Sequence, residues 1–243
     1  MMERSTLQRS LPALAIALLF AATVFVAFME IDFGEARVDD EGSVAGDYIR
    51  NGTNQTGSAN LVTSVVVNYR GFDTLGEVTV LFLAATGVGA LLSFIRKDDE
   101  KEPGKKIEPS FILNRGAGLV LPLILLFGVY IFLHGHLSPG GGFQGGVIIA
   151  SGMLLYYIAN PGKRGAHRAF SILESSAGLA FIGLGIVGLM GASKIFLAND
   201  HADIGEVGML LSAGMLPLIY ISIGLKVGAE MTGLVERMRG EAS

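Results

Sequence analysis

The sequence predicts an all-α, polytopic membrane protein with about six transmembrane helices and both termini in the cytoplasm. Three observations support this fold class. First, 51% of the 243 residues are hydrophobic and only 16% are charged, which is too apolar for an ordinary soluble domain. Second, the chain contains six long apolar runs, and about 20 such residues allow a helix to cross a bilayer. Third, lysines and arginines are distributed unevenly between the connecting segments, which predicts the orientation of the helices.

The six apolar runs give the predicted helices in chain order. They are Leu11–Phe28, Thr74–Phe94, Gly116–Leu133, Phe143–Ala159, Ala169–Met190 and Gly205–Val227. The first run follows a basic start, as a cleaved signal peptide would. However, it is longer than the usual apolar region of a signal peptide, and no clear A-x-A cleavage site follows it. We therefore interpret it as a retained membrane anchor.

The positive charges favour a cytoplasmic location for both termini. In that topology only Arg37, Arg50, Arg70 and Lys194 face the exterior, and the other fourteen of the 18 lysines and arginines face the cytoplasm. The opposite topology would reverse these numbers, against the excess of Lys and Arg that cytoplasmic loops carry. Lys226 is placed on the cytoplasmic side, at the end of the sixth predicted helix.

A charged segment divides the chain into two predicted units. Residues 96–111 are rich in charged side chains and contain a Pro-Gly pair, which is typical of a linker. Residues 1–95 form a predicted two-helix unit with an exterior loop. Within that loop, residues 42–60 are rich in Gly, Asn, Ser and Thr, and we expect them to be irregular. Residues 112–243 form a predicted four-helix unit.

Several kinds of site are not expected in this chain. It has no cysteine, which excludes disulfides, thiolate metal ligation and a cysteine nucleophile. The stretch Gly183–Gly188 matches G-x-G-x-x-G, but it lies within an apolar run with no preceding strand, so it is not a nucleotide site. No nucleophile–base set or metal constellation is visible. We therefore expect no catalytic activity from the chain by itself, no cofactor, no metal and no nucleic-acid partner.

Glu77 and Glu174 are the carboxylates predicted within the membrane. At about 1.5 Å per helical residue, Glu77 lies about 10 Å beyond Arg70 on the exterior side, and Glu174 lies about 9 Å beyond Arg168 on the cytoplasmic side. An ionisable group at such a depth normally faces the bundle interior or water and has a partner. One acid reachable from each side would suit a proton or cation path. The alternative is that each carboxylate only forms hydrogen bonds between helices or subunits.

The segment HGHLSPGGGFQGG, residues His134–Gly146, joins two apolar runs. Its glycines permit backbone conformations that other residues avoid, and its proline fixes one turn. Irregular backbone at membrane depth is tolerated only where it is buried in protein or lines a water-filled cavity. We therefore expect a re-entrant or broken-helix turn under partner subunits, with carbonyl groups available to a hydrated cation. The turn residues are Pro139, Gly140, Gly141 and Gly142.

Two stretches of the sequence resemble a known family of transport proteins. NYRGFDTLGEVTVLFLAATGV (Asn68–Val88) resembles the end of the large A subunit of Mrp-type multisubunit Na⁺/H⁺ antiporters, a segment that is a small separate subunit in membrane-bound hydrogenases. GHLSPGGGFQGGVIIASGMLL (Gly135–Leu155), with two further helices, resembles the B subunit of the same antiporters. The charged linker would then join two fused units. The chain departs from the family pattern at Leu137 and Ser138, where Asn-Ala or a similar pair is expected.

The resemblance implies a membrane subunit of a cation/proton antiporter module. The module would be free-standing or part of the membrane arm of a respiratory complex, such as a hydrogenase or a sulfur-reducing relative. The expected ion path consists of Glu77, Glu174, Asp73, Arg70, His136 and His134. The two histidines are either neutral hydrogen-bonding side chains or members of a proton relay.

The resemblance also implies particular partners. These are the other membrane subunits of the module, Na⁺ and H⁺ as transported ions, and the lipid of the cell membrane. Two alternatives remain open. The chain could be a purely structural subunit that seals neighbouring subunits, or an autonomous small transporter, which the scarcity of buried charge disfavours.

Overall fold

Helices make up the regular secondary structure of the part of the chain that the structure describes. The structure is a computed structural model, and it describes residues 3–30, 42–98, 109–163, 165–199 and 204–239. The chain forms two compact units, Met1–Gly46 and Asp47–Ser243. The first unit holds α1 (Glu3–Glu30), which includes the predicted membrane anchor.

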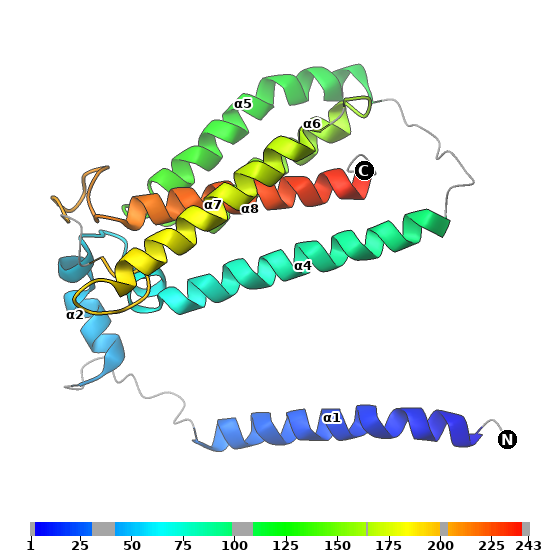
Figure 1. The fold of residues 1–243 in the computed structure, drawn as a ribbon, viewed down its shortest axis with the longest axis horizontal. Coiled ribbons are helices and arrows are strands. Elements are labelled where there is room, and N and C mark those ends of the chain that lie inside the picture. Colours follow the sequence, from blue (N-terminus) through cyan, green and yellow to red (C-terminus); the bar gives the residue numbers. More distant parts are fainter. Residues whose placement is uncertain (1–2, 31–41, 99–108, 164, 200–203, 240–243) are drawn as a thin grey trace. The chain divides into compact units, whose positions relative to one another are not determined.

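The second unit holds nearly all of the remaining helices (Figure 1). They are α2 (Val44–Thr56), α3 (Leu61–Thr63), the π-helix η2 (Ser64–Tyr69), α4 (Gly71–Asp98), α5 (Phe111–Leu133), α6 (Gly142–Ala159), α7 (His167–Leu189) and α8 (Leu216–Arg239). The five helices from α4 to α8 are long and apolar enough to cross a membrane, and α1 has a shorter apolar stretch, Ala15–Val26. The predicted all-α, multi-pass membrane fold is therefore confirmed.

The predicted start of the last helix is wrong. The apolar run predicted a helix from Gly205, whereas α8 begins at Leu216 and continues to Arg239. The backbone before it has positive φ at Gly205 (65°), Gly208 (99°), Ala213 (65°) and Gly214 (55°), a conformation that an α-helix cannot contain. Lys226 consequently lies in the middle of α8 and not at the end of a span.

The expectation of an irregular loop over residues 42–60 is also wrong, because α2 occupies most of that segment. Close contacts hold α2 in place. A Cβ atom at Gly52 would lie 2.6 Å from Cδ1 of Leu61. The Thr56 hydroxyl donates to the Gly52 carbonyl (2.8 Å) and forms a second hydrogen bond with the Ser64 hydroxyl (2.7 Å). A loop was expected because the segment has few apolar residues to bury. These contacts hold the helix in place instead.

The predicted linker, residues 96–111, lies largely outside the described residues. At its two edges, α4 ends at Asp98 and α5 begins at Phe111. The Ser110 side chain accepts a hydrogen bond from the Leu113 backbone N–H (3.1 Å) and so caps the start of α5.

Helix α8 is the central helix of the second unit. It packs against α4, α5, α6 and α7, and Figure 1 shows it running among them. In the most apolar 18-residue stretch of α8, 61% of the residues are buried, compared with 11% in the same stretch of α4 and 17% in that of α5. The outer helices therefore present apolar side chains to their surroundings, whereas α8 is enclosed by protein.

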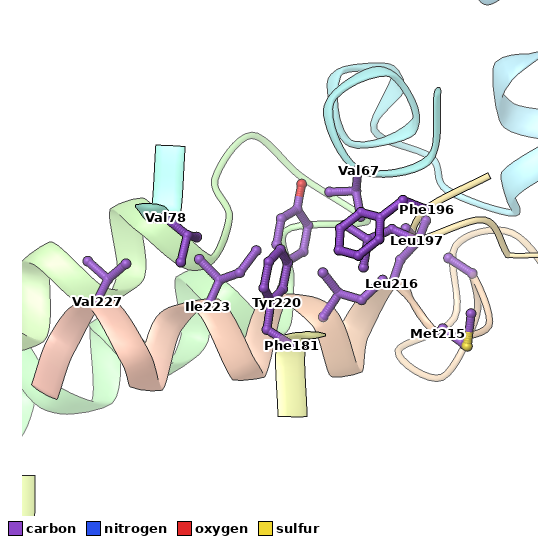
Figure 2. Packing of buried hydrophobic residues seen from close by; sticks show 12 residues of the cluster. Val67, Val78, Phe181, Phe196, Leu197, Met215, Leu216, Tyr220, Ile223 and Val227 are labelled. Atoms are coloured by element: carbon purple, nitrogen blue, oxygen red, sulfur yellow. The ribbon is translucent and has the colours of Figure 1, made fainter. Parts of the chain in front are cut away.

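An apolar cluster surrounds the first half of α8 (Figure 2). Leu216, Ile219 and Ile223 of α8 are at most 2% exposed, and Phe181 of α7 is 1% exposed. Burying a side chain of this kind stabilises a fold by roughly 1.5–3 kcal/mol. The cluster thus fixes α8 against its neighbours.

Glycines allow α6 to approach α8 closely. A Cβ atom at Gly142 would lie 2.6 Å from Cβ of Ile223, and one at Gly146 would lie 2.8 Å from both the Gly224 carbonyl oxygen and Cβ of Val227. Contacts this short are closer than real Cβ atoms allow. Any side chain at these positions would push the two helices apart.

We predict opposite effects of one substitution at two glycines. Gly146→Ala should lower the stability of the assembled protein by about 1–3 kcal/mol, because it overpacks the α6–α8 contact. Gly118→Ala should leave stability unchanged or raise it by up to about 1 kcal/mol, because no heavy atom lies within 4 Å of that site and alanine favours helix. Thermal unfolding of the purified complex in detergent measures both effects, and equal effects would contradict the packing account.

Candidate functional site

A tight turn connects α5 to α6. It runs from His134 to Gly141, and α6 starts at Gly142. Gly140 and Gly141 have φ values of 155° and 146°, which favour glycine because a Cβ atom would be strained there. Pro139 lies exposed within the turn.

The turn is held by polar side chains from a distant part of the same chain. Asn60 donates from Nδ2 to the carbonyls of Gly135 (2.8 Å) and Ser138 (2.9 Å). Ser58 donates to the His136 carbonyl (2.8 Å), and Thr63 donates to the Gly135 carbonyl (2.7 Å). These hydroxyl and amide groups therefore bond the carbonyls of Gly135, His136 and Ser138. That carbonyls of Pro139 and Gly140–Gly142 are available to a hydrated cation stays a prediction.

The two histidines of the turn lie in different environments. The His134 ring stacks on Tyr130, with centroids 4.1 Å apart, and its Nδ1 lies 3.0 Å from the Tyr130 carbonyl oxygen. His136 is fully buried, and neither ring nitrogen has a hydrogen-bond partner among the described residues. Burial lowers the pKa of His136, and the nearby backbone of Met209 and Leu210 opposes this shift. His136 is therefore neutral at pH 7.

The three charged residues of the first motif do not form one cluster. Arg70 forms an ion pair with Asp73 at the start of α4. Both side chains are more than half exposed, so this pair adds little stability. Glu77 lies one turn further along α4, and no ion pair joins it to the other two among the described contacts.

Glu77 lines a cavity of about 140 Å³, which we call the Glu77 cavity. The glycine turn and the start of α6 form one wall, and α3, η2, α4 and α8 form the others. Its lining includes Thr74, Glu77, Gly140, Gly141, Gly142, Gln144 and Tyr220. The structure thus brings Glu77 together with the glycine turn, although 63 residues separate Glu77 from Gly140 in the sequence.

Glu174 lines a separate cavity of about 40 Å³, which we call the Glu174 cavity. It lies between α4, α7 and α8, and this volume is enough for a few water molecules. Its charged or titratable lining residues are His167, Glu174, Glu230 and Arg237. Glu77 and Glu174 therefore belong to different cavities along the bundle.

Helix α8 carries several buried charged groups that were not predicted from the sequence. Lys226 is 7% exposed and Glu230 is 3% exposed, and Nζ of Lys226 lies 2.7 Å from Oε2 of Glu230. Glu236, further along the same helix, is 1% exposed. The i, i+4 spacing of Lys226 and Glu230 within an apolar helix was the available signal, but it was hidden because the predicted helix ended at Val227, before Glu230.

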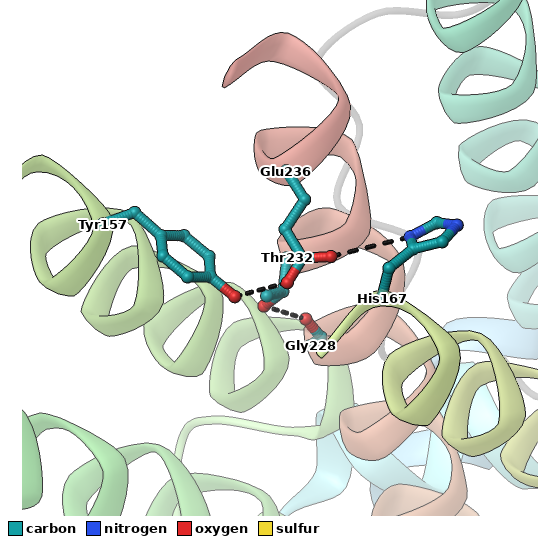
Figure 3. Close-up of polar contacts among 5 residues, drawn as sticks. All are labelled: Tyr157, His167, Gly228, Thr232 and Glu236. Atoms are coloured by element: carbon teal, nitrogen blue, oxygen red, sulfur yellow. Dashed lines mark hydrogen bonds and ion pairs between the residues drawn. The ribbon is translucent and has the colours of Figure 1, made fainter. Parts of the chain in front are cut away.

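Glu236 connects α6, α7 and α8 (Figure 3). It accepts a hydrogen bond from the Tyr157 hydroxyl, and its Oε2 lies 3.5 Å from Nδ1 of His167. The His167 side chain is 41% exposed and also lines the Glu174 cavity. His167 therefore lies between the surface, Glu236 and that cavity.

The fold and these enclosed charges define a multi-pass membrane protein with ionisable groups inside its helical bundle. The sequence of residues 112–233 matches the family described as "Domain related to MnhB subunit of Na+/H+ antiporter", and residues 9–104 match the MbhE family, which is described as the E subunit of MBH. The chain belongs to the MnhB-related family.

Two relatives illustrate this membership. An uncharacterized protein of Methanocaldococcus jannaschii is 30% identical over 194 residues, which cover 71% of this chain and 74% of the relative. A protein of Rhizobium meliloti, named as the probable A/B subunit of a K(+)/H(+) antiporter, is 30% identical over 138 residues. These residues cover 48% of this chain but only 14% of that much longer protein.

Two solved structures share the fold. A chain of the membrane-bound sulfane sulfur reductase, an archaeal respiratory membrane complex, is 41% identical with a TM-score of 0.72, covering 96% of this chain and 98% of that one. A chain of the Mrp complex from Dietzia sp. DQ12-45-1b is 24% identical with a TM-score of 0.68, covering 96% of this chain and 26% of that one. The second likeness shows the shared fold alone.

We predict that acidification destabilises the protein through His136. The unfolded chain takes up a proton near pH 6.5, whereas the buried ring does so only at lower pH. The unfolded state then binds more protons, so stability is lost as pH falls from 6.5 through the folded-state pKa. His136→Gln should reduce this loss between about pH 7.5 and about pH 5 in thermal unfolding of the complex.

His134→Gln is the matched control for this prediction. The His134 ring is only partly buried and lies in the same turn as His136. The control should keep the pH dependence of the unmodified protein. If His136→Gln also keeps that dependence unchanged, the assignment of the pH effect to His136 is wrong.

Proposed function

We propose that this chain is a membrane subunit of a cation/proton antiporter module within a larger respiratory complex, and that it helps to form the ion path. The observation that carries the proposal is the placement of Glu77 and Glu174 in two separate cavities along one helical bundle. Membership of the MnhB-related family and the likeness to a chain of a respiratory membrane complex support it.

The two cavities suit exchange between a proton and a cation. A carboxylate inside a bundle is stable only if it is protonated, paired or hydrated. Glu77 can therefore hold a proton or a hydrated Na⁺ in turn, and Glu174 can do the same from the other end. Ile223, which lines the Glu77 cavity, belongs to the buried apolar cluster around the first half of α8.

The alternative is a purely structural protein that packs and seals its neighbours. The hydrogen bonds that lock the glycine turn favour this alternative, because they need no ion traffic. In both cases the partners are other membrane subunits, which would cover the exposed apolar faces of α4 and α5. We also propose that residues 1–95 and 112–243 are two fused units, in keeping with the two matched families.

The proposed orientation places both termini in the cytoplasm. The chain has no cysteine, so single introduced cysteines report topology without background. In sealed right-side-out vesicles, Ser43→Cys should react with a membrane-impermeant thiol reagent, and Lys105→Cys should react only after the membrane is permeabilised. Reaction of Lys105→Cys in intact vesicles would overturn the orientation.

Substitution of Glu77 distinguishes a transport role from a structural one. Glu77→Gln keeps the shape and hydrogen-bonding capacity of the side chain but removes its titration. The variant complex should assemble normally and lose most cation-dependent proton movement in membrane vesicles, because its side chain can no longer exchange a proton. Glu77→Asp should retain part of the activity.

Glu206→Gln is the matched control, because Glu206 is an exposed acid in the loop before α8. It should assemble and transport as the unmodified complex does. Normal transport by an intact Glu77→Gln complex would leave the structural alternative in place.

A further inference from the structure

Lys226 and Glu230 form a buried ion pair at the middle of the enclosed helix α8. Their charged atoms are 2.7 Å apart, and both residues are more than nine-tenths buried. A buried pair contributes little net stability, because removing two charges from water costs several kcal/mol per ion. An apolar pair of similar volume would pack at least as well. Packing therefore does not explain why these two residues are charged.

One carboxylate oxygen of Glu230 is left without a partner. Oε2 accepts from Lys226, but Oε1 is buried and has no hydrogen-bond partner among the described residues. Glu230 also lines the Glu174 cavity, which has room for a few water molecules. A buried, unpartnered oxygen beside such a cavity is a ready acceptor for a proton delivered through it.

On its other side, Lys226 borders an apolar cavity of about 170 Å³, which we call the Lys226 cavity. Gly178 of α7 leaves space beside the lysine stem, since a Cβ atom there would lie 3.6 Å from Cε of Lys226. Nζ of Lys226 lies 5.6 Å from the centroid of the Phe82 ring, close enough for a cation–π attraction. Phe82 lines both the Lys226 cavity and the Glu174 cavity.

We propose that the Lys226–Glu230 pair is a charge switch between these two cavities. When a proton enters the Glu174 cavity, it binds Oε1 of Glu230 and neutralises the carboxylate. Lys226 keeps its own proton and its positive charge, so it loses its partner and moves toward Gly178 and the face of Phe82. Loss of the proton from Glu230 restores the pair. This proposal rests on the proposed function, which it deepens by naming the residues between the Glu174 cavity and the Lys226 cavity.

Charged groups from the helices around the pair support this direction of proton entry. From α7, Glu174 and the partly exposed His167 face the Glu174 cavity, and from α8 Arg237 does so. No charged residue of α4 lines either cavity among the described residues. From α6, Tyr157 bonds to Glu236, which in turn contacts His167. Protons can therefore arrive from the end of α8 where the partly exposed His167 meets the surface.

A double substitution separates a charge switch from a structural pair. Lys226→Met with Glu230→Gln keeps the side-chain lengths and removes both charges together, so neither charge is left buried alone. In the assembled complex in vesicles, this variant should assemble at the normal level and slow cation-dependent proton movement by about tenfold or more. Transport at the normal rate by the assembled double variant would overturn the proposal.

A second variant tests the movement of Lys226 without altering either charge. Gly178→Leu should fill the Lys226 cavity, so the ion pair stays intact but the lysine cannot leave Glu230. We expect normal assembly and slowed transport, and this result decides the question if the double variant fails to assemble. Transport at the normal rate by Gly178→Leu would overturn the proposal that Lys226 moves toward Gly178.

Lys163→Met is the matched control, because it makes the same chemical change at an exposed lysine. It should transport normally. The outcome also separates this proposal from the proposed function. If Glu77→Gln abolishes transport while the double variant transports normally, the protein lies on the ion path but the α8 pair is structural. If neither substitution affects transport in an assembled complex, the proposed function fails as well.

Discussion

The close approach of α6 to α8 is the contact on which the rest of the bundle depends. Gly142 and Gly146 present almost no side chain to α8, so backbone atoms of the two helices come into contact. Gly224 of α8 also makes room for the Phe132 ring of α5. Because of these contacts α8 is enclosed by other helices, and its Lys and Glu side chains are shielded from lipid.

Enclosure of α8 determines how the polar groups of this protein are satisfied. In a bilayer, charged side chains are stable only against protein, water or each other. Lys226 therefore pairs with Glu230, and Glu236 bonds to Tyr157 and lies near His167. The same requirement explains the glycine turn, whose carbonyls are bonded by side chains from the segment before α4. These polar groups lie where another part of the chain can reach them.

Much of the fold could be predicted from hydropathy, because a spanning helix needs only length and apolar composition. The start of α8 could not, because the run from Gly205 onward is as apolar as a helix but contains Ala213 and Gly214 at positive φ. The helix α2 was missed for the opposite reason, since it is polar and is held by specific contacts such as that of Thr56 with Ser64.

The candidate site was only partly predictable. The rise of a helix predicts Glu77 and Glu174 at depth, and in the structure both line cavities. Which groups share those cavities depends on tertiary contacts: Gly140 reaches the Glu77 cavity, and Glu230 reaches the Glu174 cavity. No regular spacing of residues in the sequence indicates such pairings between distant parts of the chain. Lys226 was assigned to the helix end because the predicted run stopped at Val227, whereas α8 continues to Arg239.

We propose that the enclosed helix α8 moves charge between the Glu174 cavity and the Lys226 cavity. The account requires that Glu230 gains and loses a proton while the complex works. Infrared difference spectroscopy of the assembled complex detects this directly, because a protonated carboxylic acid has a carbonyl band that a carboxylate lacks. We expect such a band to appear on acidification and to be missing in the Glu230→Gln complex. The same difference spectrum in both complexes would contradict the account.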